Sequence, residues 1–257
     1  MSNQPSITVI IPYKNNLKYL FSALHSVFKQ TYNNLRICII YDNENKLDLF
    51  KLKIFLKKIR IKKLPPIKIE INKKNLGAGF SRNVGIKKSN TEYLAFLDAD
   101  DRWKKNKLKE QIYFMERNNL LFSHTTYNII NSENEVISKR VAKSKIAFDE
   151  LLKSCDIGLS TVMVKTNFLK KNNYYFPKIK TKEDFVLWLK IIKDIKLIRG
   201  MKKTLTYYRK TNNSLSSDKF LSLVNGYKVY RNYMNFGRMR SVYFLILLSI
   251  NFIKKNL

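Results

Sequence analysis

The ten residues EYLAFLDADD, numbers 92 to 101, decide the fold of this chain. They join a short apolar run, typical of a buried strand, to an acidic cluster at the point where that strand ends. Like charges this close repel, so the cluster is costly unless a cation or a hydrogen-bond network occupies it. Asp98 and Asp100, as D-x-D, offer oxygen ligands suited to Mg²⁺ or Mn²⁺. The alternative is a solvated acidic turn or a helix cap.

Strands and helices alternate before this stretch. Apolar periodicity predicts strands at 6–11, 36–40 and 67–71, the first stopped by Pro12, and helices at 17–30, 47–63 and 77–88. Such alternation argues for an α/β fold with a parallel sheet and right-handed crossovers. Ligands of such sheets bind beyond the carboxyl ends of the strands, so we expect functional residues at 12–16, at Asp42 and at 98–101.

The second half is predicted to be more mixed. Helices are expected at 105–118 and 182–193, and strands at 120–127, 136–140, 159–164, 196–199 and 204–209. No repeat or low-complexity linker divides the chain, so we predict one domain of two unequal halves over residues 1–218. A basic, apolar helical segment follows at 219–257.

Composition excludes some classes of protein and leaves others open. A chain of 257 residues with 45% hydrophobic residues can bury a core, which excludes a disordered basic tail. The net charge of +31, from 50 Lys and Arg against 19 Asp and Glu, favours anionic partners, although coding drift toward Lys explains part of it. Cys38 and Cys155 form no C-x-x-C pair, which argues against a disulfide framework or a structural zinc site.

The C-terminal segment combines positive charge with apolar residues. No Asp or Glu follows Asp218, and the apolar run 242–253 has basic residues on both sides. That run is shorter than the roughly 20 residues needed to span a bilayer, so no transmembrane helix is expected. It suits docking on an anionic membrane surface, and a helix packed on the core is the alternative. The start of the chain resembles no secretion signal, so we expect a cytoplasmic protein.

A glycine-rich stretch, NLGAGFSRN, occupies residues 75–83. Its glycines allow close approach of a ligand to the backbone, and Arg82 is suited to a phosphate. The dinucleotide-binding fingerprint does not match, because Arg82 stands at its third glycine and the glycines do not directly follow a strand. A nicotinamide cofactor is therefore not expected.

Taken in series, these motifs resemble glycosyltransferase family 2. They run SITVIIPYKNN from residue 6, SVFKQTY from 26, IIYD from 39, NLGAGFSRN from 75, YLAFLDADD from 93 and KEDFVLWL from 182. The resemblance implies the GT-A (Rossmann-like) fold with a mostly parallel central sheet, a smaller acceptor-side half and C-terminal helices. It also implies a nucleotide-sugar-binding half at 1–104, an acceptor-side half at 105–218, and inverting transfer from a nucleotide-activated sugar.

The resemblance implies donor contacts for residues at the strand ends. Pro12 and Tyr13 would hold the nucleotide, and Asp42 would contact the base or ribose, although only one acid remains of the pair usual in the family. Asp98 and Asp100 would match the D-x-D that binds the ribose and the metal-bound diphosphate. Asp101 would be a further metal ligand or a support for the other two.

Two later residues would complete the site. Asp184 would match the base that removes the proton of the acceptor hydroxyl; the alternative is an acidic first turn of a helix, stabilised by the helix dipole. Arg209, in YYRKTNNSLS with Tyr208, Ser214 and Ser216, would contact the diphosphate from a loop that closes over the donor, or is an ordinary basic turn. His25 and His124 lack partners at metal-ligand spacing and are expected to be structural, with an acceptor-side position as the alternative for His124.

We therefore expect an inverting, Mn²⁺- or Mg²⁺-dependent hexosyltransferase. It would move a sugar from a nucleotide-sugar, a UDP-sugar by preference, to a lipid-linked saccharide at the inner face of the bacterial cytoplasmic membrane, in O-antigen, capsule or lipooligosaccharide synthesis. One alternative is a sugar nucleotidyltransferase, although PYKNN after the first strand lacks the usual Gly-rich, Arg-containing loop. The other is a basic nucleic-acid-binding protein, for which the sequence has no recognised motif.

Overall fold

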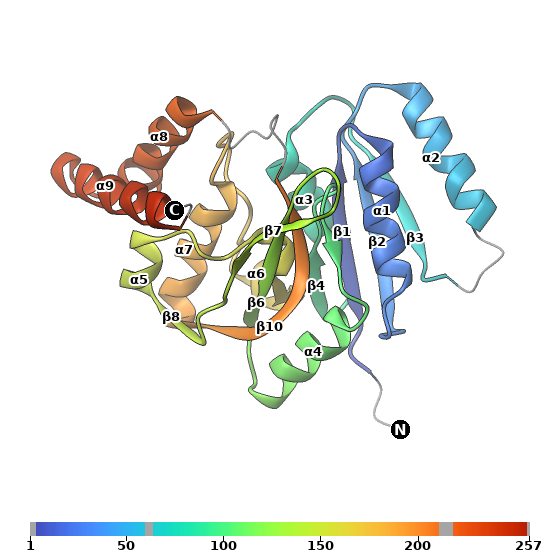
Figure 1. Cartoon of the computed structure of the whole chain (residues 1–257), viewed down its shortest axis with the longest axis horizontal. Coiled ribbons are helices and arrows are strands. Elements are labelled where there is room, and N and C mark those ends of the chain that lie inside the picture. The colour runs from blue at the N-terminus through green and yellow to red at the C-terminus, as the bar shows by residue number, and fades with distance from the viewer. Residues whose placement is uncertain (1–3, 60–63, 211–217, 256–257) are drawn as a thin grey trace.

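The structure is a computed structural model that describes residues 4–59, 64–210 and 218–255 (Figure 1). A ten-stranded sheet extends through both halves of the chain, in the order β3-β2-β1-β4-β9-β6-β10-β5, with β7 beside β6 and β8 beside β10. Helices cover both faces of this sheet. The architecture is the α/β fold with a mostly parallel central sheet that the sequence predicts.

The first four strands of the chain are parallel. They are β1 (Ile7–Tyr13), β2 (Leu35–Tyr41), β3 (Ile67–Ile71) and β4 (Tyr93–Phe96), joined by α1 (Leu17–Phe28), α2 (Lys46–Ile59) and α3 (Ala78–Lys88). Their carboxyl ends therefore meet at one edge of the sheet, where α/β proteins bind ligands. The residues after β1, β2 and β4 are brought to this common edge.

The other strands extend the sheet beyond β4. They are β5 (Arg102–Trp103), β6 (Phe122–Ile130), β7 (Val136–Arg140), β8 (Lys145–Ala147), β9 (Met163–Lys165) and β10 (Leu197–Arg209). Strand β9 is antiparallel to β4 and β6, whereas β10 runs parallel to β6. Strand β5 pairs with the end of β10, so the residues that follow the acidic cluster lie against the late part of the chain.

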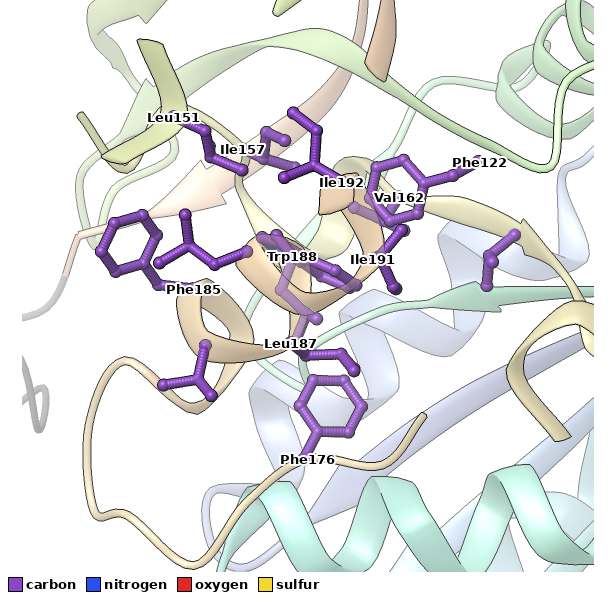
Figure 2. Packing of buried hydrophobic residues seen from close by; sticks show 14 of the residues in the cluster. Phe122, Leu151, Ile157, Val162, Phe176, Phe185, Leu187, Trp188, Ile191 and Ile192 are labelled. Atoms are coloured by element: carbon purple, nitrogen blue, oxygen red, sulfur yellow. The ribbon is translucent and has the colours of Figure 1, made fainter. Parts of the chain in front are cut away.

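Two apolar layers pack on the sheet. One contains α1, α2 and α4 (Lys107–Arg117), and the other contains α3, α5 (Phe148–Lys153), α6 (Thr166–Lys171) and α7 (Glu183–Ile195). Strand β1 supplies both, because Val9 and Ile11 point to one layer and Ile10 to the other. Figure 2 shows Trp188 of α7 in the second layer, where its ring lies 4.9 Å from that of Phe122.

The C-terminal helices lie at the end of the molecule opposite α2 (Figure 1). They are α8 (Lys219–Lys228), a π-helical turn (Val229–Tyr233) and α9 (Arg238–Lys254). Phe244 and Leu248 of α9 are buried in the second apolar layer. No helix in the described ranges combines the length and the apolar character needed to cross a bilayer.

Several predicted boundaries were wrong. Strand β1 continues through Pro12, which pairs with Ile40 of β2. The pairing of β1 with β4 ends at Ile10, so the missing N–H of Pro12 removes no hydrogen bond between these two strands. Residues 159–164 are a 3₁₀ turn (Leu159–Thr161) followed by β9. The two late strands are one strand, β10, whose register shifts between Met201 and Thr206.

Candidate active site

The acidic cluster lies directly after β4, at the carboxyl edge of the sheet. Asp98 and Asp100 are partly exposed, whereas Asp101 is 1% exposed. The Oδ1 atom of Asp101 accepts the backbone N–H of Arg209 at 2.8 Å, and its Oδ2 atom is buried without a partner among the described residues. Asp101 therefore anchors the end of β10, whereas Asp98 and Asp100 stay partly exposed.

Arg82 of α3 connects this cluster to α7. Its Nη2 donates to Asp98 Oδ1 at 2.7 Å and its Nη1 to Glu183 Oε1 at 2.9 Å, while its guanidinium lies 5.4 Å from the centre of the Phe176 ring. The residue is 4% exposed. Burial acts to lower the pKa of Arg82, but the two carboxylates outweigh it and leave the pKa raised. The sequence suggested that Arg82 contacts a phosphate. In the structure its guanidinium instead bridges two carboxylates of the protein.

Asp184 follows Glu183 in the first turn of α7, where its Oδ1 accepts the N–H of Phe185 at 2.7 Å. Burial, and then the charge of Glu183, raise the pKa of Asp184 to about 7. Arg82 acts in the opposite direction. The side chain thus has the pKa of a carboxylate able to accept a proton near neutral pH.

The cluster after β4 resists full ionisation. Burial, and then Asp98, raise the pKa of Asp100 to about 6. Burial, and then Asp100, raise the pKa of Asp101 well above its ordinary value. Crowded carboxylates of this kind gain stability from a cation, which favours their charged forms.

Asp42, at the end of β2, holds the segment that leads into α3. Its Oδ1 accepts Asn72 Nδ2 and the N–H of Leu76, both at 2.8 Å, and its Oδ2 accepts the N–H of Gly77 at 2.7 Å. Gly77 has φ +84°, a conformation that favours glycine. Three of the four lone pairs of Asp42 are therefore used within the protein, and the predicted contact to base or ribose would have only the fourth.

Pro12 and Tyr13 are buried at the end of β1. The hydroxyl of Tyr13 donates to Asp48 Oδ2 at 2.9 Å, and its ring centre lies 5.3 Å from that of Tyr41. Burial, and then the bond to Asp48, raise the pKa of Tyr13. The backbone N–H of Asp42 donates to the carbonyl of Tyr13 at 2.7 Å, so the ends of β1 and β2 lie side by side.

Arg209 lies at the end of β10 and not in a loop. Its Nε donates to the carbonyl of Asp100 at 3.0 Å, and its Nη atoms donate to the β6–β7 turn, to the carbonyls of Asn131 and Ser132 and to Asn134 Oδ1. The guanidinium also lies 4.6 Å from the centre of the Tyr19 ring. Arg209 thus joins the acidic segment to three other elements. Ser214 and Ser216 are outside the described residues.

Ser160 organises the cluster from the opposite side, and sequence reasoning missed it. Its Oγ accepts the N–H of Asp98 at 3.0 Å, and its carbonyl accepts the indole N–H of Trp103 at 2.7 Å. A lone serine in a predicted strand gives no signal for this role. His124, by contrast, is 1% exposed and packs beside Gly200, so it is a structural residue of the core.

Residues 8–175 match the family described as glycosyl transferase family 2. The chain belongs to this family. It is therefore a glycosyltransferase, and its sheet and helices form the GT-A fold. The family match favours this function over the two alternatives, a sugar nucleotidyltransferase and a nucleic-acid-binding protein.

Named relatives and a solved structure resemble the chain over most of its length. It is 33% identical to the UDP-Glc:alpha-D-GlcNAc-diphosphoundecaprenol beta-1,3-glucosyltransferase WfgD of Escherichia coli, over 97% of this chain and 94% of that protein. It is 30% identical to the putative teichuronic acid biosynthesis glycosyltransferase TuaG of Bacillus subtilis, over 99% and 98%. The structure of S. aureus TarS 1–349 with UDP-GlcNAc matches with a TM-score of 0.70 and 21% identity, over 93% and 70%.

The D-x-D residues of this glycosyltransferase fit a divalent cation. The described ranges hold no group of three or more His, Cys, Asp and Glu side chains arranged to bind a metal ion. Mg²⁺ and Mn²⁺ are commonly held by one or two carboxylates together with substrate phosphates and water. Asp100 and the Oδ2 atom of Asp98, whose Oδ1 binds Arg82, would supply those carboxylates.

Replacing Arg82 by Met is expected to lower the free energy of unfolding by about 3 kcal/mol, because Asp98 and Glu183 then lose their shared buried cation. Urea unfolding at pH 7 measures this change. Lys68→Met is the matched control: Lys68 pairs with Glu70 at 2.6 Å but is 67% exposed, so its loss should leave the unfolding curve unchanged. Equal stability of the Arg82→Met variant and the wild type would contradict the bridging role.

Proposed function

We propose that this glycosyltransferase is an inverting hexosyltransferase that transfers a sugar from a UDP-sugar to a hydroxyl of a lipid-linked saccharide. The reaction would take place at the inner face of the bacterial cytoplasmic membrane, in the synthesis of a surface polysaccharide. The observation that supports this most is the Arg82 bridge, which joins the strand end bearing Asp98 and Asp100 to the helix turn bearing Asp184. The names of WfgD and TuaG favour the lipid-linked acceptor and the polysaccharide product.

In this proposal Asp184 is the general base. An acceptor hydroxyl is a poor nucleophile until its proton is removed, and a carboxylate with a pKa of about 7 takes up a proton readily near neutral pH. Attack from the face opposite the leaving diphosphate inverts the anomeric centre. Glu183 is engaged by Arg82, so it holds the first turn of α7 in place and leaves the proton transfer to Asp184.

The acidic cluster would bind the donor. Asp98 and Asp100 would hold a divalent cation, which when bound stabilises the negative charge that develops on the leaving diphosphate. Asp101 and Arg209 would keep this segment in position, since they fix it to β10 and to the β6–β7 turn. The direct contact of Arg209 with the diphosphate would require its present hydrogen bonds to rearrange.

Substitution of the two acids should separate donor binding from proton transfer. Asp100→Asn is expected to abolish the thermal stabilisation given by a UDP-sugar with Mn²⁺, together with transfer. Asp184→Asn should keep that stabilisation and lose about 10³-fold in kcat. Asp149→Asn, an exposed acid on α5, serves as control for the loss of one carboxylate. Full transfer activity in both variants would overturn the site assignment, and a screen of UDP-, GDP- and dTDP-sugars would test the donor.

The pH dependence of transfer should report the ionisation of Asp184. Because its protonated form cannot accept the hydroxyl proton, kcat/KM is expected to fall about tenfold per pH unit below an apparent pKa of about 7. In Glu183→Gln this limb should move to lower pH, since the charge of Glu183 raises the pKa of Asp184. A profile that stays flat through this range would contradict the role of Asp184 as base.

Helix α9 supports the membrane part of the proposal. Its buried face contains Phe244 and Leu248, each 7% exposed. On the opposite face, apolar side chains recur at helical spacing and are 42–89% exposed: Met239, Val242, Tyr243, Ile246, Ile250 and Ile253. A continuous exposed apolar stripe on a helix with Arg238 and Arg240 at its start and Lys254 at its end suits an anionic membrane interface. The sequence left core packing and membrane docking as alternatives. In this proposal α9 would do both, with its buried face on the core and its exposed face on the membrane.

Ile246→Asp is expected to weaken binding to phosphatidylglycerol vesicles at physiological salt by about tenfold or more, because it places a charge in the apolar stripe. Vesicle flotation measures the bound fraction. Ile137→Asp is the matched control, since Ile137 on β7 has the same 52% exposure as Ile246 but lies outside α9. Equal vesicle binding by the two variants would contradict docking through α9.

A further inference from the structure

A second candidate binding region lies along α1, outside the acidic cluster. It is a groove of about 1020 Å³, and neither Asp42, Asp98, Asp100 nor Asp184 lines it. One wall is a single face of α1, and the other is formed by β5, the residues after it and Tyr207 of β10. A groove of this size can hold a ligand of several chemical groups.

The charge of this groove has one sign. Five cationic side chains line it, and no Asp or Glu does: Lys18, Lys29, Lys51, Arg102 and Lys105. Within the described part of the chain none of the five has a carboxylate within 4.0 Å. They come from α1, α2 and the segment after the acidic cluster, so the fold brings together cations that are distant in sequence. Converging like charges repel, and an anion in the groove offsets that cost.

Arg102 has a side-chain donor that no described residue uses. Its Nε atom is buried and has no hydrogen-bond partner among the described residues. Its guanidinium lies 5.5 Å from the centre of the Tyr207 ring, which holds it at the wall of the groove. Burial, and then the charge of Arg209, lower the pKa of Arg102. A planar guanidinium with unused donors is well suited to phosphate oxygens.

The apolar part of the lining gives the groove a fixed shape. Phe21 of α1 stacks on Phe55 of α2 with ring centres 4.0 Å apart, and Trp103 is 4% exposed and bonded through its indole to Ser160. The backbone positions that carry the cations are thus fixed by this framework. Gln30 and Thr31 bond to the carbonyls of Lys104 and Lys105, which fixes the two walls to each other.

We propose that this groove is a binding site for a phosphate-bearing ligand, separate from the donor site. The ligand would be recognised by Lys29 from one wall of the groove and by Arg102 and Lys105 from the other. Either the headgroup of an anionic phospholipid or a soluble phosphate compound has this chemistry. The inference goes beyond the proposed function, because it depends on neither the D-x-D residues nor the base.

The test uses inorganic pyrophosphate as the probe, titrated calorimetrically into the full chain in the presence of EDTA and without donor. Chelation removes the divalent cation on which donor binding at the acidic cluster would depend. Lys29→Gln/Lys105→Gln is expected to bind pyrophosphate about tenfold more weakly than the wild type. The control Lys109→Gln/Lys139→Gln removes the same charge from exposed positions outside the groove and should bind like the wild type.

Two further arms separate the possible outcomes. Asp100→Asn should bind pyrophosphate normally under these conditions, so failure of the proposed transfer function would leave this result intact. In an Ile246→Asp background, which removes the proposed docking through α9, further loss of phosphatidylglycerol vesicle binding on adding Lys29→Gln/Lys105→Gln would identify a lipid headgroup as the ligand, and no further loss would identify a soluble phosphate. Absence of pyrophosphate binding by the wild type at millimolar concentration, or equal binding by the groove variant and its control, would overturn the proposal.

Discussion

The buried guanidinium of Arg82 is the interaction on which the site depends. It lies between the carboxylates of Asp98 and Glu183, and so joins the end of β4 to the start of α7, although Arg82 and Glu183 are 101 residues apart in the sequence. A buried cation is costly without its partners, and either carboxylate alone would be costly without the cation. The three groups are stable only together, so this bridge fixes the distance between the acidic cluster and Asp184. Asn83, the next residue of α3, reinforces it through two bonds of 2.8 Å to the backbone of Phe176.

The same bridge sets the protonation of its neighbours. Arg82 favours the charged forms of Asp100 and Asp184, whereas burial and the adjacent carboxylates oppose them. The balance leaves Asp100 with a pKa of about 6 and Asp184 with a pKa of about 7. A metal ion held by Asp98 and Asp100, as proposed, would favour their charged forms in the same direction as Arg82 does. In the proposed site, donor binding would therefore be linked electrostatically to the ionisation of Asp184.

The sequence predicted the features that arise from local patterns and from serial order. Alternating apolar runs identified β1 to β4 with their helices, and the order of the motifs indicated the family. It missed β5 and β8, which have two and three residues and show no periodicity, and the short helices α5 and α6. The hydrogen-bond partners of Arg82 and Asp42 could not be predicted from the sequence either, because tertiary packing determines which residues lie beside a buried charge. The metal ligands, the base and the donor contacts stay predictions.

The net charge of +31 has little influence on the acidic cluster, and the reason is distance and solvent. Most lysines lie on the exposed surface, where water and salt screen their fields within about 8–10 Å. Arg82 and Arg209 differ, since they are 4% and 2% exposed and bond directly to the segment 98–101 or its supports. A change of surface lysines should thus alter how the protein meets anionic partners without changing the ionisation of Asp100 or Asp184. The two buried arginines, and not the surface lysines, thus favour the ionised form of Asp100.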